Sequence, residues 1–481
     1  MRTAVRTRCR PAFTLVELLV SLALILFLMT IISEAFGAAA TTFRNLKAIG
    51  DLCQKLRIAS NMLRRDLAAD HFEGRKRLSD PNFWQNGPPR EGYFRIYQDT
   101  NPTLEGYDLD DIRSYISAHQ IIRFTSKFHG NERDDYFVGT VPSNAPAPLS
   151  PTANGADSRY EDVNNTVGSG GQFLYQFRFD WAEIAYFLRP QVNPIGLVQD
   201  TANGQPLYAL YRRQWLSCVD NYALNQTSQK VKVETVTGGL HPVTTQNMQF
   251  YLETSTMPDP AGTGFPLNSP NYFLYFNSPI DLTVPPRRMG TTTDQPSGRP
   301  PPYVAPSAPY VAFSPSALFT ASSTLLSTPT LAEDVNRYSG SSNVLSGSDL
   351  LLTDVISMDV RVLLAGNTDF VSLDDGSVQA YASMNPNFNA NATAYSSSST
   401  TNKYLFDTWS SVTDDYYDFS DWSTGTNTTD HLIPLYQFNS SLSSTYPTLP
   451  PLISIKAIQV VIRIWDYKTN QARQVTVVQD L

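Results

Sequence analysis

The chain has 481 residues, of which 41% are hydrophobic and only 17% charged, with a formal net charge of −8. Together with abundant Tyr, Asn, Ser and Thr, this balance is typical of a β-rich extracytoplasmic protein. Basic residues concentrate before the first acidic residue, Glu17, and the body that follows carries no run of Lys and Arg able to neutralise phosphates. We therefore expect no nucleic-acid partner.

Residues 13–32 are an apolar stretch, FTLVELLVSLALILFLMTII, of about the 20 residues that cross a bilayer as a helix. Four arginines lie within residues 1–12, and no further basic residue occurs before Arg44. Because cytoplasmic flanks carry the excess of Lys and Arg, this asymmetry predicts a single-pass helix with a cytoplasmic N-terminus.

Two other interpretations of this stretch stay open. A secretory signal peptide would be cut after Ala38-Ala39-Ala40, giving a mature start near Thr41, but its apolar region would exceed the usual length of about 7 to 15 residues. A plain signal anchor fits the length but gives no reason for the carboxylate of Glu17. A charge within the hydrocarbon costs about 2.5–3.5 kcal/mol at mid-span, so such a residue usually has a partner.

The tract Ala12-Phe13-Thr14-Leu15-Val16-Glu17, followed by Leu18-Leu19-Val20, resembles the processing site of type IV pilins and type II secretion pseudopilins. The resemblance implies that prepilin peptidase cuts between Ala12 and Phe13 and that the new amine of Phe13 is methylated. It also implies that Glu17 is the assembly carboxylate, pairing with the amine of a neighbouring subunit. The family nearly always has Gly where this chain has Ala12, which leaves the efficiency of cleavage open.

The physical logic of a buried carboxylate agrees with this resemblance. A buried ion pair adds little net stability, whereas an unpaired buried charge is strongly penalised, so such a pair fixes register. Glu17 would thereby specify where the next helix lies.

A helical pattern continues from residue 34 to about residue 70. Apolar or small side chains return every three or four positions, at Leu46, Ile49, Cys53, Leu56, Ala59, Leu63 and Leu67. Polar residues lie mostly on the other side, at Lys47, Arg57, Arg64, Arg65 and Asp66. We predict one long helix over 13–70, with 13–32 in the membrane or fibre core and the second half packed on a head.

The remainder, residues 71–481, reads as strands separated by polar segments. Alternation predicts a ribbon with one aromatic face over Phe173–Trp181, continuing through Ile184, Tyr186 and Leu188, that covers the long helix. Further strands are predicted at 207–219, 230–236, 247–252 and 349–364, with a terminal hairpin formed by 458–464 and 474–478 around a turn at 468–471. The predicted fold class is α+β, a long N-terminal helix packed on an antiparallel β-sheet head.

Large insertions are predicted near 141–172, 254–348 and 366–450, which are rich in Pro, Ser, Thr, Asn and Gly and read as flexible surface segments. Since loops of that length are uncommon in a compact domain, short hairpins within some of them are an alternative. The expected organisation is therefore a basic leader (1–12), the long helix (13–70) and a β-rich periplasmic head (71–481).

The order of elements adds a second resemblance. A long helix, the tract Ile184–Leu188, then Leu210–Arg213 and a late pair of strands is similar to the J-type minor pseudopilin, although the insertions here are far larger. The chain also resembles large pilin-like proteins encoded in multigene cassettes of Verrucomicrobia and related bacteria.

The sequence has neither the G-x-S-x-G elbow of a serine hydrolase nor the H-E-x-x-H pair of a zinc metalloprotease. We expect no enzyme and no cofactor. Oxygen-rich clusters near Asp108–Asp111, Asp374–Asp375 and Asp414–Asp421 are the only candidate calcium ligands, and solvated surface acids are the favoured interpretation. The cysteines lack a C-x-x-C pair; Cys53 and Cys218 either pair with each other or are small buried residues.

The leading functional hypothesis is a minor pseudopilin of a type II secretion or related system, held in the bacterial inner membrane and then assembled into a fibre. Its expected partners are other pilin or pseudopilin subunits, prepilin peptidase, the inner membrane and secreted cargo. A second hypothesis is an adhesin or ligand-binding module displayed on a pilus-like fibre, favoured by the Tyr-, Asn- and Thr-rich insertions. A third is a secreted hydrolase with a signal peptide.

Overall fold

The structure of the chain is a computed structural model. It describes residues 14–83, 89–99, 103–107, 113–118, 120–142, 160–167, 173–191, 200–202, 204–217, 230–233, 254–258, 272–283, 288, 350–373, 388–389, 403–408, 455–467 and 469–481. These residues fall into two compact units: the chain up to Lys55 with Asp466–Gln471, and Leu56–Trp465 with Ala472–Leu481.

A single helix, α1 (Leu15–Ala68), spans 54 residues without a proline. Its first turn begins at Thr14, whose carbonyl oxygen accepts the amides of Glu17 at 3.1 Å and Leu18 at 3.2 Å. Glu17 lies in this first turn, where its negative charge interacts favourably with the helix dipole. Arg65 lies in the last turn, where a positive charge has the same effect. The long helix predicted over 13–70 is confirmed.

The buried face of α1 differs in part from the predicted one. Leu56, Ala59, Leu63 and Leu67 are buried as expected. Leu46, however, is 62% exposed and Cys53 is also exposed, so their predicted inward positions are wrong.

Asp66 shows the opposite error. It was grouped with the outward-facing charges, yet it is only 1% exposed. Because Asp66 lies three positions after Leu63 and seven after Ala59, it belongs to the helix face that meets the sheet.

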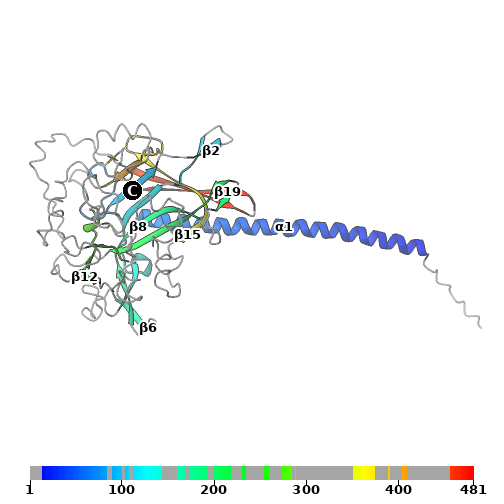
Figure 1. The fold of residues 1–481 in the computed structure, drawn as a ribbon, viewed down its shortest axis with the longest axis horizontal. Coiled ribbons are helices and arrows are strands. Elements are labelled where there is room, and N and C mark those ends of the chain that lie inside the picture. Colours follow the sequence, from blue (N-terminus) through cyan, green and yellow to red (C-terminus); the bar gives the residue numbers. More distant parts are fainter. Residues whose placement is uncertain are drawn as a thin grey trace, which may run out of the picture. The chain divides into compact units, whose positions relative to one another are not determined.

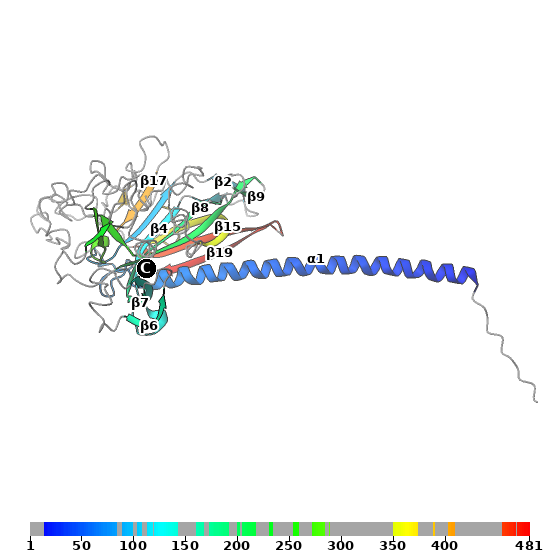
Figure 2. The same ribbon diagram turned by 60° about the horizontal axis from the view of Figure 1, so that its bottom comes forward.

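The head is built on a nine-stranded sheet (Figures 1 and 2). Its order is β16 (Phe388–Asn389), β17 (Lys403–Asp407), β1 (Phe94–Asp99), β4 (Gln120–Lys127), β8 (Trp181–Pro190), β11 (Tyr208–Ser217), β15 (Leu350–Leu364), β18 (Ile455–Asp466) and β19 (Gln471–Asp480). The pairs from β16 to β18 are antiparallel, as predicted. The strands predicted at 207–219, 349–364 and the terminal hairpin correspond to β11, β15 and β18–β19.

The described residues also form four smaller antiparallel sheets. The order β5 (Phe137–Pro142), β7 (Phe173–Phe179), β6 (Tyr160–Val167) forms one, and β12 (Lys230–Val233), β14 (Tyr272–Phe276), β13 (Thr256–Pro258) forms another. Two-stranded pairs join β2 (Thr103–Tyr107) to β3 (Arg113–Ile116) and β9 (Thr201–Ala202) to β10 (Gln205–Pro206). Short 3-10 turns occupy Arg133–Asp135 and Asp281–Thr283. The strand predicted at 247–252 lies outside the described residues.

The aromatic ribbon predicted from Phe173 to Leu188 is two strands of two different sheets. The chain turns at the exposed Asp180, so that β7 pairs with β5 and β6 whereas β8 enters the nine-stranded sheet. From Trp181 to Arg189 every residue of β8 is buried. The prediction of one continuous ribbon with a single buried face is therefore wrong, because β8 is covered on both faces.

The predicted insertions contribute strands. β6 lies within 141–172, β13 and β14 within 254–348, and β16 and β17 within 366–450. One edge of the nine-stranded sheet is thus formed by chain from a region whose composition resembles a linker: β17 pairs with β1 across some 300 residues of sequence, with Ile96 opposite Phe406.

A buried polar cluster attaches one such region to the sheet. Glu183 on β8 is fully buried and accepts hydrogen bonds from the Tyr93 hydroxyl at 2.5 Å and the Ser255 hydroxyl at 2.9 Å, and it pairs with Arg123 of β4. Burial raises the pKa of Tyr93, which keeps its phenol protonated as a donor. In addition, the Ser255 amide donates to Leu216 O at 2.8 Å, so 254–258 is bonded to both β8 and β11.

Gly92 gives a first prediction, since it lies where helix end and sheet meet. Its φ is 75°, and a Cβ there would overlap the His71 carbonyl oxygen and the Thr125 hydroxyl. Gly74, with φ 63°, has nothing within 4 Å of such a Cβ. We expect Gly74→Ala to cost about 1–2 kcal/mol for the left-handed backbone alone, and Gly92→Ala to cost at least about 2 kcal/mol more, because backbone must move.

Urea unfolding of the detergent-solubilised chain, followed by the fluorescence of the buried Trp181 and Trp215, measures both variants. Equal loss of stability in the two variants would contradict the close approach at Gly92.

Candidate functional site

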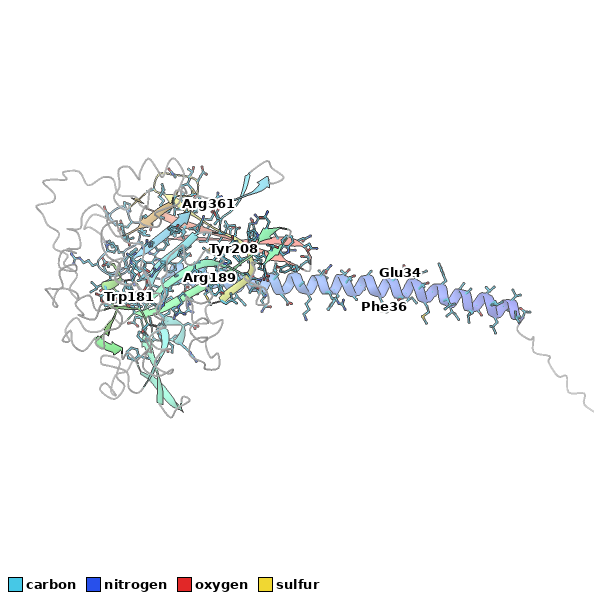
Figure 3. All side chains as sticks on the ribbon, in the orientation of Figure 1. Glu34, Phe36, Trp181, Arg189, Tyr208 and Arg361 are labelled. Carbon is cyan, nitrogen blue, oxygen red and sulfur yellow. The ribbon has the colours of Figure 1, made fainter. Side chains whose placement is uncertain are left out.

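The N-terminal part of α1 presents an apolar surface. Every side chain from Thr14 to Lys47 is exposed, including Phe27 at 65% and Phe36 at 72%. Figure 3 shows these side chains standing out around the helix, with Glu34 and Phe36 on different sides. Contiguous apolar surface of this extent marks a contact with lipid or with other protein.

This part of the helix also meets the requirements for crossing a membrane. It contains an 18-residue window with a mean hydropathy of 2.8, none of which is buried. Residues 15–32 provide about the length of a bilayer core at 1.5 Å per residue. We call residues 15–32 the apolar segment.

Glu17 is the one acidic residue within residues 15–32, and it is exposed. Its Oε2 lies 3.5 Å from the Thr14 hydroxyl, a distance too long for a strong hydrogen bond, while its amide donates to the same hydroxyl at 3.4 Å. Ala12 and Phe13, the expected processing site, lie outside the described residues. The structure thus places Glu17 on the surface of the apolar segment, in the first turn of α1.

The C-terminal end of α1 is bonded to the sheet through Asp66. Asp66 Oδ2 accepts the Tyr186 hydroxyl at 2.5 Å and Arg212 Nε at 2.6 Å, and Oδ1 accepts Arg212 Nη2 at 3.0 Å. Tyr186 belongs to β8 and Arg212 to β11, where the two residues are directly paired. We call these three residues the Asp66 cluster.

The electrostatics of the Asp66 cluster suit a buried ion pair. Burial raises the pKa of Tyr186, and the Asp66 charge raises it further, so the phenol remains a donor. Burial alone would lower the pKa of Arg212, but the neighbouring Asp66 carboxylate outweighs it and raises that pKa. Arg212 is therefore a permanent cation in bidentate contact with Asp66.

Three backbone contacts continue the attachment beyond Asp66. Its carbonyl oxygen accepts the Ser126 hydroxyl at 3.0 Å. The Lys127 amide donates to Asp70 O at 2.7 Å, and the Thr125 hydroxyl donates to His71 O at 2.7 Å. β4 thus binds the chain where it leaves the helix.

Sequence reasoning did not find the Asp66 cluster. Arg212 falls in the Leu210–Arg213 tract and Tyr186 in the Ile184–Leu188 tract. Both tracts entered only the similarity to the J-type minor pseudopilin, and no contact with Asp66 was predicted for either. The signal available was the helical phase of Asp66, in line with Ala59 and Leu63.

His71 is fully buried between the helix end and the sheet and gives a pH-dependent prediction. Its ring nitrogens lie 2.7 Å from Thr125 O and 3.2 Å from Leu67 O, and the rings of Phe72, Phe94 and Phe124 surround it. Burial lowers the pKa of His71 from its ordinary 6.5; the two carbonyls and the carboxylates of Asp70 and Asp66 oppose this to a smaller extent.

Because the folded state resists protonation, the unfolded chain binds a proton first as the pH falls below 6.5. The contribution of neutral His71 to stability is therefore complete above that pH and is lost progressively below it. Thermal unfolding at about pH 7.5 and about pH 5.5 measures this loss, which should be smaller in His71→Gln. The same pH dependence in both proteins would show that His71 is not its source.

The structure tests the predictions on metal ligands and cysteines only in part. Among the described residues no group of three or more His, Cys, Asp or Glu could hold a metal ion. The acidic clusters near Asp108–Asp111, Asp374–Asp375 and Asp414–Asp421 lie outside those residues. Cys53 is a free, exposed thiol, and Cys218 lies outside the part of the chain that the structure describes.

Comparison with known proteins finds a known motif at the N-terminal end of the chain. A profile described as the prokaryotic N-terminal methylation motif matches residues 7–33, which include Ala12, Phe13 and Glu17. No curated protein and no solved structure matched the chain. The motif indicates a type IV pilin-like chain that prepilin peptidase processes and that assembles with other pilin subunits. The apolar segment is consistent with membrane anchoring.

Proposed function

We propose that the chain is a minor pseudopilin-like structural subunit of a type II secretion or related system, and not an enzyme. The observation that carries the proposal is the exposed apolar segment with Glu17 in its first turn, within the matched methylation motif. The sheet-bearing head supports the same reading, because its order of elements resembles the J-type minor pseudopilin.

Assembly follows from the chemistry of this segment. In the inner membrane, residues 15–32 are solvated by lipid, with the N-terminus cytoplasmic and the head periplasmic. In the fibre, helices of neighbouring subunits replace the lipid. The methylated amine of a neighbour's N-terminal residue then pairs with Glu17, so that neither charge is left alone in an apolar environment.

The pair acts on register more than on stability. Apolar packing between helices tolerates sliding, whereas a buried amine and a buried carboxylate each need the other. The head would then bind other minor subunits or secreted cargo.

A strain that lacks the gene distinguishes a role in secretion from a role in adhesion. Loss of the gene should reduce a set of proteins in the culture supernatant, and the native chain should restore them while Glu17→Leu should not. Unchanged secretion together with lost adherence to a surface would favour the adhesin hypothesis and overturn the proposed role. Unchanged secretion and adherence would overturn both.

A further inference from the structure

The attachment of α1 to the head contains a feature that apolar packing alone does not require. Leu56, Ala59, Leu63 and Leu67 already bury one helix face against the sheet. The Asp66 cluster adds an ion pair there, with Asp66 1% exposed. Replacing a buried ion pair by apolar groups is often neutral or stabilising, so such a pair is weak evidence of a need for stability.

The Asp66 cluster instead restricts where along the sheet, and in which rotation, the helix can pack. Leu, Ala and other aliphatic contacts are similar after a helix slides by one turn, about 5.4 Å, or rotates slightly. Asp66, by contrast, accepts hydrogen bonds on both carboxylate oxygens from residues of two adjacent strands, Tyr186 and Arg212. Any slip would leave the buried carboxylate of Asp66 and the partly buried guanidinium of Arg212 without each other.

Arg212 is itself held from a second side. Its Nη1 donates to Gln214 Oε1 at 2.9 Å, while Nε and Nη2 face Asp66. The planar guanidinium is therefore held by a residue of its own strand as well as by the helix. Only one axial position of the helix then matches the bidentate geometry.

We propose that Asp66 is a positioning residue that sets the axial and rotational register of α1 on its own head. The inference rests on the proposed function. Glu17 fixes a helix against its neighbours, and Asp66 fixes the head against that helix. Since α1 is continuous from Leu15 to Ala68, the register set at Asp66 determines at which height in the fibre the head is presented.

The test measures register directly in the full chain in detergent. Spin labels are placed at Asn61→Cys on α1 and Gln474→Cys on β19, both exposed positions, after the native cysteines are replaced by Ser. Pulsed electron resonance then reports the distance distribution between the labels. The parent protein should give one narrow distribution.

The informative variant replaces the cluster by apolar groups, with Asp66→Leu, Arg212→Met and Tyr186→Phe together. We expect a second distance displaced by up to about one helical turn, 5.4 Å, or a broadened distribution. A matched control, Asp359→Leu with Arg361→Met, removes a more exposed pair on β15 and should leave the distribution unchanged.

A distribution in the apolar variant identical to that of the parent would overturn the proposal. If that variant fails to fold, Arg212→Lys serves instead, because it keeps the charge but cannot make the bidentate contact; broadening supports the proposal and an unchanged distribution overturns it. The measurement needs no fibre, so it fails or succeeds independently of the pseudopilin assignment, which the Glu17 variants test.

Discussion

Replacing Glu17 by Leu is expected to keep the chain out of any fibre while leaving it anchored in the membrane. The substitution makes the apolar segment more apolar, so insertion into the bilayer is preserved. It removes the only carboxylate within residues 15–32, and a neighbour's N-terminal amine would then be buried without a counter-charge. Truncating one partner of a buried charge pair costs about 2–5 kcal/mol, which weakens subunit association at least about thirtyfold.

Chemical cross-linking in cells, followed by immunoblotting of sheared fibres, measures incorporation. Glu34→Leu is the matched control, because Glu34 is an exposed acidic residue of the same helix that lies beyond residues 15–32. It should assemble normally. Incorporation of Glu17→Leu at the level of the native chain would contradict the assembly role of Glu17.

Replacing Asp66 by Ala is expected to destabilise the head by about 3 kcal/mol, because it leaves the charged, partly buried Arg212, whose side chain is 16% exposed, without its carboxylate. Tyr186 loses its acceptor in the same substitution. Urea unfolding monitored by tryptophan fluorescence provides the measurement.

The control for Asp66→Ala is Asp359→Ala. Asp359 pairs at 2.8 Å with Arg361, whose side chain is 43% exposed, and a solvent-exposed pair contributes only about 0–1 kcal/mol. Similar losses in the two variants would show that the Asp66 cluster is not desolvated as the structure indicates.

Much of the N-terminal site could be predicted from the sequence, because a bilayer imposes strict rules on length and charge. Residues 13–32 have the length of a membrane span, and Glu17 is conspicuous there because a carboxylate in hydrocarbon is costly. The helix beyond was predicted in extent but not in phase. A pattern of apolar residues at intervals of three or four is compatible with more than one buried face, so Cys53 was placed inside and Asp66 outside.

The strands of the sheet were harder to predict from the sequence, for a different reason. β4, with the sequence QIIRFTSK, is buried at all positions but Lys127, yet it contains Gln, Arg, Thr and Ser. Its polar side chains contact partners distant in sequence, such as Glu183 for Arg123. Since alternation of polar and apolar residues is absent from such a strand, neither β4 nor β1 was predicted.

Pairing between distant segments was equally hidden. β17 comes from a segment whose Ser- and Asn-rich flanks resemble a linker, but its Phe406 is fully buried opposite Ile96. Composition averaged over 366–450 could not reveal one five-residue strand.

The most direct test of the pilin pathway is the mass of the mature N-terminal peptide, taken from membranes of cells with and without prepilin peptidase. We predict a peptide that begins at a methylated Phe13 in cells with the peptidase and an uncut leader in cells without it. A mature start near Thr41 in both would contradict the pathway, because the chain would then be a secreted protein that loses Glu17 with its signal peptide.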